Sequence, residues 1–324
     1  MATVAALWLA LAIDRWLGEP AARWHPVVWM GRYLGWAGRR IAPQADAARS
    51  RDRARLAAGA MAWCAGAAMV LAVAGAVAAV ADRLPGWAQA LLLGLALKPL
   101  LAWRMLRDEV LAVEAVLARS LDEGRARLAR LVSRDVHALT EAEVRESAIE
   151  SLAENLNDSV VAPLFWFVLF GLPGAALYRF ANTADAMWGY RGVRDGRVWD
   201  WAGKWAARAD DVLSWLPARL TAFLLLLSCS LSRERERAGV RALPATAREA
   251  RRTPSPNSGW PMAAMALCLG VRLVKPGIYT LHAAGREALA ADTQRAASLA
   301  ARVVALSAVL ASASILGLAA FRGA

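Results

Sequence analysis

A run of acidic side chains spaced four residues apart marks the stretch from 140 to 158. Thr140 and Glu143 form the pattern of a capping box, which predicts a helix from about residue 141. Side chains four apart are neighbours on one helix face, where like charges repel by about 0.2–0.5 kcal/mol per pair in water. We therefore expect a metal ion, an ammonium group or arginines to compensate this acidic stripe. Its members are Glu146, Glu150, Glu154 and Asp158.

Three further polar groups lie beside apolar segments. Carboxylate and amide oxygens suit Mg²⁺, and arginines suit phosphate or carboxylate groups. The loop SPNSGWP at 255–261 precedes an apolar run too short to span a membrane, and a loop that leads into a helix suits anion binding through backbone N–H groups. The groups are Asp14, Arg15 and His25; Arg179, Asn182, Asp185, Tyr190 and Arg191; and Asp210, Asp211 and Arg219 with this loop, which holds Asn257 and Trp260.

The sequence carries none of the common catalytic motifs. It has no GxxxxGK[ST], GxGxxG, HExxH or GxSxG. Ionisable residues near membrane helices are expensive and are usually paired or functional. The residues alone favour a site for a phosphorylated or carboxylated ligand at a membrane surface. A transporter with an intramembrane polar pathway and a purely structural membrane scaffold are the alternatives.

The elements that must position these groups are membrane helices. The chain has 324 residues, of which 58% are hydrophobic, and residues 56–81 carry no charge. Such a run forms about 39 Å of helix, which exceeds one hydrocarbon core. We predict an all-α, polytopic integral membrane protein of one domain, 1–324, with about five transmembrane helices plus amphipathic or re-entrant helices and cytoplasmic helical loops. The other expected spans are 87–103, 159–178, 212–231 and 303–321.

Several segments between the spans carry their own expectations. Residues 1–13 predict a short embedded helix, 14–35 a structured loop, and 104–139 a polar helix with a solvated face. The arginine-rich stretch 39–55 predicts a solvated or lipid-facing cytoplasmic arm, and the arginine-rich half of 232–298 predicts a cytoplasmic amphipathic helix. Gly171, Pro173 and Gly174 predict a break, after which 159–178 either spans once or returns as a re-entrant hairpin.

The formal net charge of +12 comes almost wholly from arginine. Arginines that flank apolar helices are typical of positive-inside topology and of attraction to anionic lipid. We therefore expect a lipid bilayer as partner and no nucleic acid. The 82–86 loop, nearly free of basic residues, is expected outside. We predict a multi-pass protein of the cell inner membrane whose active site faces the cytoplasm.

Five stretches in order resemble the adenosylcobinamide-phosphate synthase family of cobalamin biosynthesis, the CobD/CbiB membrane proteins. The match departs from the common family pattern at Val136, Ala186, 156–157 and the Gly–Glu–Pro turn, and it keeps the charged members of each polar group. The stretches are DRWLGEP with HPVVWMGR at 14–32, SRDVHALTEAEVRESAIESLAENLNDSVVAPLFW at 133–166, FANTADAMWGYR at 180–191, ARADDVLSWLPARL at 207–220 and SPNSGWPMAAMALCLGVRL at 255–273.

The resemblance implies an enzyme that forms an amide bond on a corrinoid. The free propionate of adenosylcobyric acid is joined to (R)-1-aminopropan-2-ol or its O-phosphate, with ATP and Mg²⁺ as the expected cofactors. A free carboxylate is a poor electrophile, so phosphorylation to an acyl phosphate is the expected activation. Further copies of the chain or other enzymes of the cobalamin pathway are expected as protein partners.

For such a reaction, the chemistry of the residues themselves, and not the family pattern, suggests roles for the polar groups. Catalytic roles fall to Glu150, Glu154, Asp185 and His25, with His25 or Asp185 taking a proton from the amine. Mg²⁺ or the incoming ammonium is expected at Glu150, Glu154 and Asp158, while Arg15, Arg179 and Arg191 meet phosphate or propionate. The other expected substrate contacts are Asp14, Asn155, Asn182, Tyr190, Asp211, Asn257 and Trp260.

Overall fold

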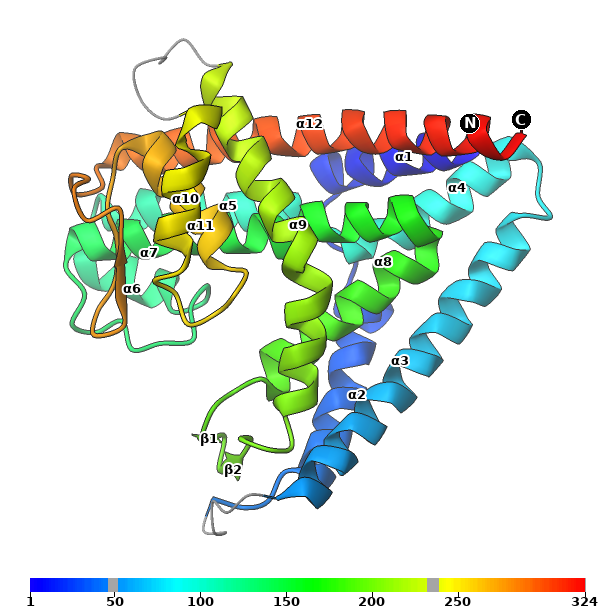
Figure 1. Cartoon of the computed structure of the whole chain (residues 1–324), viewed down its shortest axis with the longest axis horizontal. Helices are drawn as coiled ribbons and strands as arrows, with labels where there is room; N and C mark the ends of the chain where they lie inside the picture. Colours follow the sequence, from blue (N-terminus) through cyan, green and yellow to red (C-terminus); the bar gives the residue numbers. More distant parts are fainter. Residues whose placement is uncertain (46–51, 232–238, 324) are drawn as a thin grey trace. The chain divides into compact units, whose positions relative to one another are not determined.

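Helices make up most of the described part of the chain, and the strands found there form two short hairpins (Figure 1). The computed structural model describes residues 1–45, 52–231 and 239–323, so the middle of the arginine-rich stretch 39–55 (46–51) and the start of the one that begins at residue 232 (232–238) lie outside the described residues. The helices form two compact units, each discontinuous in sequence. Unit 1 comprises Met1–Ala102, Ala162–Ser214 and Ala311–Ala324; unit 2 comprises Trp103–Val161 and Trp215–Leu310.

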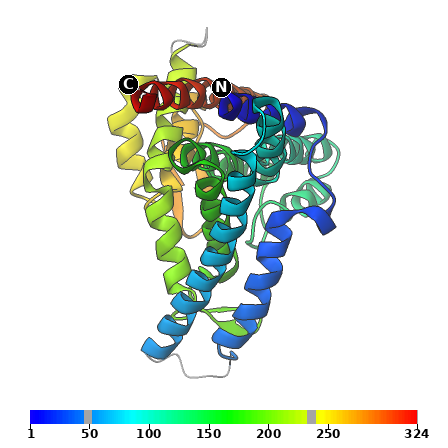
Figure 2. The ribbon, with the colours of Figure 1, turned by 90° about the vertical axis from the view of Figure 1, so that its right-hand side faces the viewer.

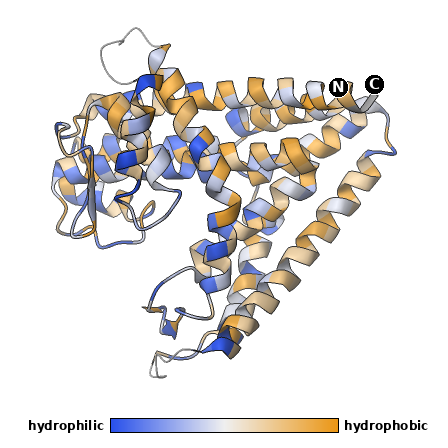
Figure 3. Ribbon diagram, viewed as in Figure 1, coloured by the Kyte–Doolittle hydropathy of each residue, from blue (hydrophilic) through white to orange (hydrophobic). Residues whose placement is uncertain are grey.

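The helix lengths confirm the predicted membrane-protein class. Five helical stretches of the described chain are long and apolar enough to cross a membrane. The first of them, the helix labelled α3, is hydrophobic along nearly its whole length in Figure 3. The five are Arg53–Ala81, Gly86–Leu117, Glu141–Trp188, Lys204–Ser230 and Ala290–Phe321.

Unit 1 packs apolar helices against one another. The helix α1 packs along α4, and α2 and α8 both pack along α3 (Figure 2). Phe180 and Leu97 are fully buried in this core. Its elements are α1 (Ala2–Trp16), the 3-10 turn η1 (Ala22–Trp24), α2 (Pro26–Ile41), α3 (Arg53–Ala81), α4 (Gly86–Leu97), the 3-10 turn η2 (Lys98–Leu100), α8 (Ala162–Trp188), the strands β1 (Val193–Arg194) and β2 (Arg197–Val198), the first part of α9 (Lys204–Ser230) and the end of α12 (Ala290–Gly323).

The loop predicted for 14–35 is wrong in its second half, because α2 begins at Pro26. Proline is tolerated in the first turn of a helix, where its missing N–H would have no partner. His25 caps this helix, since its Nδ1 accepts a hydrogen bond from the Val27 backbone N–H at 3.3 Å. Met30 and Leu34 then turn inward at helical spacing and are buried. The Pro and Gly content of this stretch therefore marks a helix start, not a continuing loop.

The break predicted at 171–174 is a sharp fold inside α8. Gly171 has φ 63° and ψ −154°, a conformation essentially restricted to glycine. A Cβ added at Gly174 would overlap the carbonyl oxygen of Trp166. Residues eight apart lie about 12 Å apart along a straight helix, so the chain must double back here. Figure 1 shows the two arms, Ala162–Phe170 and Leu172–Trp188, meeting at this bend, which favours the hairpin alternative.

Unit 2 is built around α7 (Glu141–Leu156), which α5, α6, α11 and β3 contact. The predicted capping box is present: Glu143 N–H donates to Thr140 Oγ1 at 3.3 Å, and Thr140 N–H donates to Glu143 Oε2 at 2.7 Å. The other elements are α5 (Trp103–Leu117), α6 (Leu121–Leu128), the π turn η3 (Asn157–Val161), the remainder of α9, the 3-10 turn η4 (Val240–Ala242), α10 (Leu243–Ala250), α11 (Gly259–Leu269), β3 (Leu273–Lys275), β4 (Tyr279–Leu281) and α12 as far as Leu310.

The hairpin of β3 and β4 was not expected from the sequence. Its strands pair antiparallel, with Lys275 opposite Tyr279. Between them the Ile278 N–H donates to the Lys275 carbonyl oxygen at 2.9 Å, and Gly277 has φ +71°. Proline followed by a glycine with positive φ is the chemistry of a type II turn. The turn sets Lys275 and Tyr279 side by side next to α7.

Candidate active site

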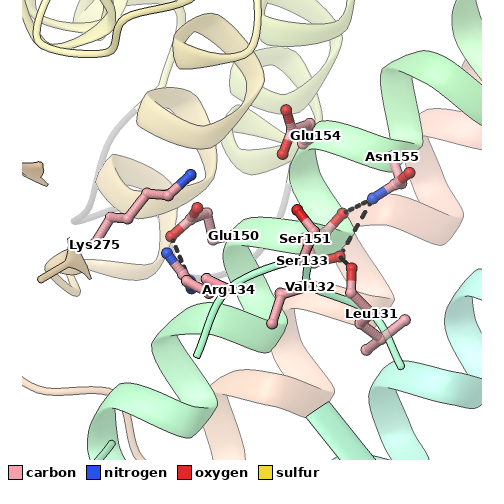
Figure 4. Close-up of a pocket in the computed structure, with 9 residues that line it drawn as sticks. All are labelled: Leu131, Val132, Ser133, Arg134, Glu150, Ser151, Glu154, Asn155 and Lys275. Atoms are coloured by element: carbon pink, nitrogen blue, oxygen red, sulfur yellow. Dashed lines mark hydrogen bonds and ion pairs between the residues drawn. The ribbon is translucent and has the colours of Figure 1, made fainter. Parts of the chain in front are cut away.

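A small polar pocket of about 120 Å³ lies in unit 2 against the acidic helix α7 (Figure 4). Three elements build its wall: the connection before α7, one face of α7, and the end of β3. Four of its side chains are charged. The lining residues are Leu131, Val132, Ser133, Arg134, Glu150, Ser151, Glu154, Asn155 and Lys275.

Glu150 is held at both of its carboxylate oxygens. Arg134 Nη2 lies 3.2 Å from Oε2, and the Tyr279 hydroxyl donates to Oε1 at 2.8 Å. Only 5% of Glu150 is exposed, so these two contacts replace most of its hydration. Burial, together with the charge of Glu150, raises the pKa of Tyr279 well above its usual value. Tyr279 therefore remains a protonated donor to the carboxylate.

Glu146 has an arginine partner of its own. It is fully buried, with Arg272 Nε 3.5 Å from Oε1, and the Val274 N–H donates to Oε2 at 3.2 Å. Of the three compensating groups expected for the acidic stripe, arginine thus serves both Glu146 and Glu150. Both arginines lie outside α7, so the helical spacing of the acidic residues could not identify them.

The remaining members of the stripe diverge. Glu154 lines the pocket, and Asn155 Nδ2 donates to the Ser151 carbonyl oxygen at 2.9 Å. Asp158 lies in the π turn, where it accepts a hydrogen bond from Asn157 Nδ2 at 2.8 Å, and it is not among the lining residues. The π turn is wider than an α-helix, so the four-residue spacing no longer keeps Asp158 in the same surroundings as the other acidic residues.

The metal prediction meets a restricted donor set. Among residues 1–45, 52–231 and 239–323, no three or more Asp, Glu, His or Cys side chains are grouped so that they could hold a metal ion. Mg²⁺ commonly uses only one or two carboxylates and completes its shell with water and substrate phosphate oxygens. Glu154, with Glu150 beside it, fits that limited role. Mg²⁺ at this pocket stays a prediction.

The pocket also offers positive charge. Arg134 is largely buried, and its Nε and Nη1 have no hydrogen-bond partner. Figure 4 shows Lys275 extending from β3 toward the acidic side chains of α7. A buried guanidinium with unused donors is well suited to a phosphate or carboxylate group.

Sequence reasoning did not select Arg134, Lys275 or Tyr279. Two weak signals pointed to them. Lys275 is one of only three lysines in an arginine-rich chain, and the Pro–Gly pair at 276–277 separates it from Tyr279 at hairpin spacing. Arg134 lies inside a stretch that carries the family resemblance.

In unit 1, Asp14 and His25 belong to one buried charge network. Lys98 Nζ lies 3.2 Å from Asp14 Oδ1 and 2.8 Å from Glu19 Oε1, and His25 Nε2 lies 3.1 Å from Glu19 Oε2. Asp14 is 1% and Lys98 3% exposed. Arg15, which the sequence grouped with them, is exposed instead. Glu19 and Lys98 were not selected from the sequence.

The second polar group of unit 1 lies at and after the end of α8. Arg179 Nη1 donates to Asn182 Oδ1 at 3.3 Å, and Asp185 follows one turn further along the same arm. The Tyr190 ring is covered by the Arg194 guanidinium, 3.8 Å from its centroid. Asp211, on α9, feels the positive charge of Arg191. Their predicted roles in substrate binding and proton transfer are not tested by these contacts.

The third group is divided. Asp210 belongs to unit 1, where it accepts a hydrogen bond from Ser214 Oγ at 3.4 Å. In unit 2, Arg219 Nη1 donates to Asn257 Oδ1 at 3.0 Å, and the guanidinium lies 4.8 Å from the centre of the Trp260 ring. The structure thus brings Asn257 and Trp260 together around Arg219, which anchors the 255–261 loop to α9.

Residues 7–309 match the sequence model of the family described as CobD/Cbib protein. The chain belongs to the CobD/Cbib family. This membership confirms the resemblance noted from the five stretches and assigns the chain a role in cobalamin biosynthesis.

Relatives of the CobD/Cbib chain come from archaea and bacteria. A probable cobalamin biosynthesis protein CobD of Methanothermobacter thermautotrophicus is 37% identical over 284 residues, 87% of each chain. One from Pyrococcus abyssi is 40% identical over 290 residues, 90% of this chain and 89% of the relative. The cobalamin biosynthesis protein CobD of Brucella suis is 38% identical over 306 residues, 89% of each chain. No solved structure matches the chain significantly.

Proposed function

We propose that this membrane protein forms the amide bond between (R)-1-aminopropan-2-ol, or its O-phosphate, and the free propionate of the corrinoid adenosylcobyric acid. The observation that carries this proposal is the pocket beside α7, with Arg134 and Lys275 on its basic side and Glu154 on its acidic side. A phosphorylated amino alcohol carries a phosphate and an ammonium group a few bonds apart. The two sides of the pocket match those two charges.

The chain's own residues account for binding and for one proton transfer. Arg134 and Lys275 bind the anionic group, and the ion pair with Glu150 holds Arg134 in position. An ammonium ion is no nucleophile, so the amine must lose a proton before it attacks, and Glu154 is placed in the pocket to accept it. His25 and Asp185 stay predicted alternatives for this base, both in unit 1.

Activation of the propionate comes from outside the chain. A carboxylate is a poor electrophile, and ATP with Mg²⁺ supplies the phosphoryl group that turns its oxygen into a leaving group. Mg²⁺ would be held mainly by phosphate oxygens and water, with Glu154 as its protein carboxylate before the amine binds, because both oxygens of Glu150 already have partners. Reaction at the cytoplasmic face of the cell membrane would give access to cytoplasmic ATP.

The direct test supplies purified protein, in detergent or in vesicles, with adenosylcobyric acid, Mg²⁺ and aminopropanol or its phosphate, with and without ATP. Corrinoid mass reports amide formation. We expect product only when ATP is present. Product without any nucleotide would contradict ATP-dependent activation, and no product with either amine would contradict the proposed reaction itself.

A second arm tests the pocket. Glu154→Gln keeps the shape of the side chain and removes its charge and basicity, so we expect turnover to fall by at least about 100-fold, the usual contribution of a positioned general base. Glu123→Gln on α6 is the matched control, since Glu123 is exposed and does not line the pocket. Equal turnover of both variants and the wild type would mean that Glu154 is only a solvated charge.

A further inference from the structure

Unit 1 contains a second cavity of a different kind. It has a volume of about 460 Å³ and lies among α2, α3, α4 and the second arm of α8. Small residues leave the space open, because Ala74, Ala96 and Ala176 all line it where larger side chains would fill it. The remaining walls are valine, leucine, methionine, proline and aromatic side chains.

The cavity offers nothing to a polar ligand. No charged residue lines it, and its only side-chain N–H and O–H donors belong to Trp29 and Tyr33. Both are already used: Tyr33 donates to the Ala62 carbonyl oxygen at 2.7 Å, and Trp29 donates to the Arg23 carbonyl oxygen at 3.0 Å. A buried water normally needs two to four polar partners, so water is a poor occupant. The occupant that fits these walls is hydrocarbon.

Position along α3 indicates where that hydrocarbon comes from. The lining residues of α3 run from Gly66 to Val77, in the interior of the uncharged run 56–81. Only 22% of the apolar window of this helix is buried within the protein, so most of its surface meets lipid. The cavity therefore lies at the depth of the bilayer's hydrocarbon core.

The cavity also opens sideways. Met69 and Val73 line it, yet 49% of Met69 and 66% of Val73 is exposed. These two residues sit four apart on α3 and form a lateral edge. A lipid chain next to α3 can pass this edge without crossing any polar surface.

We propose that one acyl chain of a membrane phospholipid occupies this cavity as a bound lipid. An unbranched, flexible chain adapts to a long apolar space. Because the cavity opens at Met69 and Val73, a lipid chain can enter it and make the van der Waals contacts that an unfilled space would lack. A bound chain would couple α2, α3, α4 and α8 through lipid contacts.

The test measures lipid that stays with the protein. The full-length protein is reconstituted in vesicles of phosphatidylethanolamine and phosphatidylglycerol, extracted in mild detergent and examined by native mass spectrometry. We expect one phospholipid to remain bound after detergent exchange. A bound mass equal to a free fatty acid, or a second copy of the chain seated in place of lipid, would overturn the proposal.

Adjacent residues on α3 supply matched variants. Ala74→Phe fills the cavity, whereas the neighbouring Gly75 has open space where its Cβ would be, so Gly75→Phe adds the same bulk outside it. We expect at least a tenfold loss of retained phospholipid in Ala74→Phe and none in Gly75→Phe. Ala176→Leu fills the cavity from α8 and covers the case in which Ala74→Phe does not fold. Unchanged retention in a folded cavity-filling variant would contradict the proposal.

Discussion

Each unit contains a buried charge network. The two networks are similar in composition and differ in the hydrogen-bond donors that they leave available to a ligand. In unit 1, Lys98 lies between Asp14 and Glu19, and none of the three lines either of the two cavities described above, so we call this the closed network. In unit 2, Arg134 binds Glu150 and still keeps two buried nitrogen donors without partners beside a pocket. A buried ion pair alone is weak evidence for either stability or function. The difference lies in whether the network faces a space that a ligand can enter.

The closed network should give the largest effect on stability. Lys98→Met leaves the buried charges of Asp14 and Glu19 without their cation, and we expect a loss of about 3–5 kcal/mol in the free energy of unfolding. Chemical unfolding in detergent, followed by circular dichroism, measures it. The triple variant Lys98→Met, Asp14→Asn, Glu19→Gln removes all three charges and should recover much of the loss. If the single variant is as stable as wild type, the network has no structural role.

The open network should instead show its effect in substrate binding. Arg134→Lys keeps the positive charge and loses the planar set of donors, and a hydrogen bond to a charged group contributes about 1.5–3 kcal/mol. We expect KM for the phosphorylated amine to rise about 10- to 100-fold, with KM for the unphosphorylated amine changing much less. Steady-state kinetics with both amines decide it. Equal changes for the two amines would place Arg134 away from the phosphate.

Acid should weaken the closed network of unit 1. Burial opposes ionisation of Glu19, but hydrogen bonds from His25 and Lys98 outweigh it and hold the pKa of Glu19 below its usual value. The resulting stability is fully present above about pH 4.3, the ordinary glutamate value, and is lost as the pH falls through the lowered pKa. Unfolding free energies measured across this range should fall less steeply in Glu19→Gln. An identical slope in the variant would exclude Glu19 as a contributor.

Removal of an exposed ion pair should have the smallest effect on stability and turnover, and it serves as the reference for the other variants. Arg119 and Glu123 lie 3.6 Å apart with most of each side chain exposed. Pairs of this kind contribute about 0–1 kcal/mol, so Arg119→Ala should leave unfolding and turnover nearly unchanged. A loss as large as that of Lys98→Met would mean that the assay responds to any charge removal, which would remove the contrast between the networks.

The long apolar helix α3 and the capped start of α7 could be predicted from the sequence because their causes are local. The capping box at Thr140 and the uncharged run of α3 depend only on near neighbours, and both are confirmed. The start of α2 could not be predicted in the same way, because proline is common both in loops and in the first turn of a helix. The hairpin of β3 and β4 was missed because three-residue strands have too little periodicity to detect.

Only some of the residues that form the pocket could be predicted from the sequence. Glu150 and Glu154 follow from helix spacing, and arginine was one of the expected compensating groups. The actual partners of Glu150 lie 16 and 129 residues away, at Arg134 and Tyr279. Contacts at that separation depend on tertiary packing, and no spacing rule in a single sequence encodes them.

The bend at Gly171 also limits how deep this part of the backbone can lie in a bilayer. Leu169 and Phe170, just before the bend, are 42% and 64% exposed, while the bend interrupts the regular helical ladder of peptide hydrogen bonds. Hydrocarbon cannot satisfy exposed peptide groups, so irregular backbone facing lipid is not tolerated deep in a bilayer. The tip of α8 therefore needs lipid headgroups or water around its peptide groups, which places it near the membrane surface. Its position thus indicates how deep unit 1 lies in the bilayer, with the side chains of Leu169 and Phe170 contacting lipid near the surface.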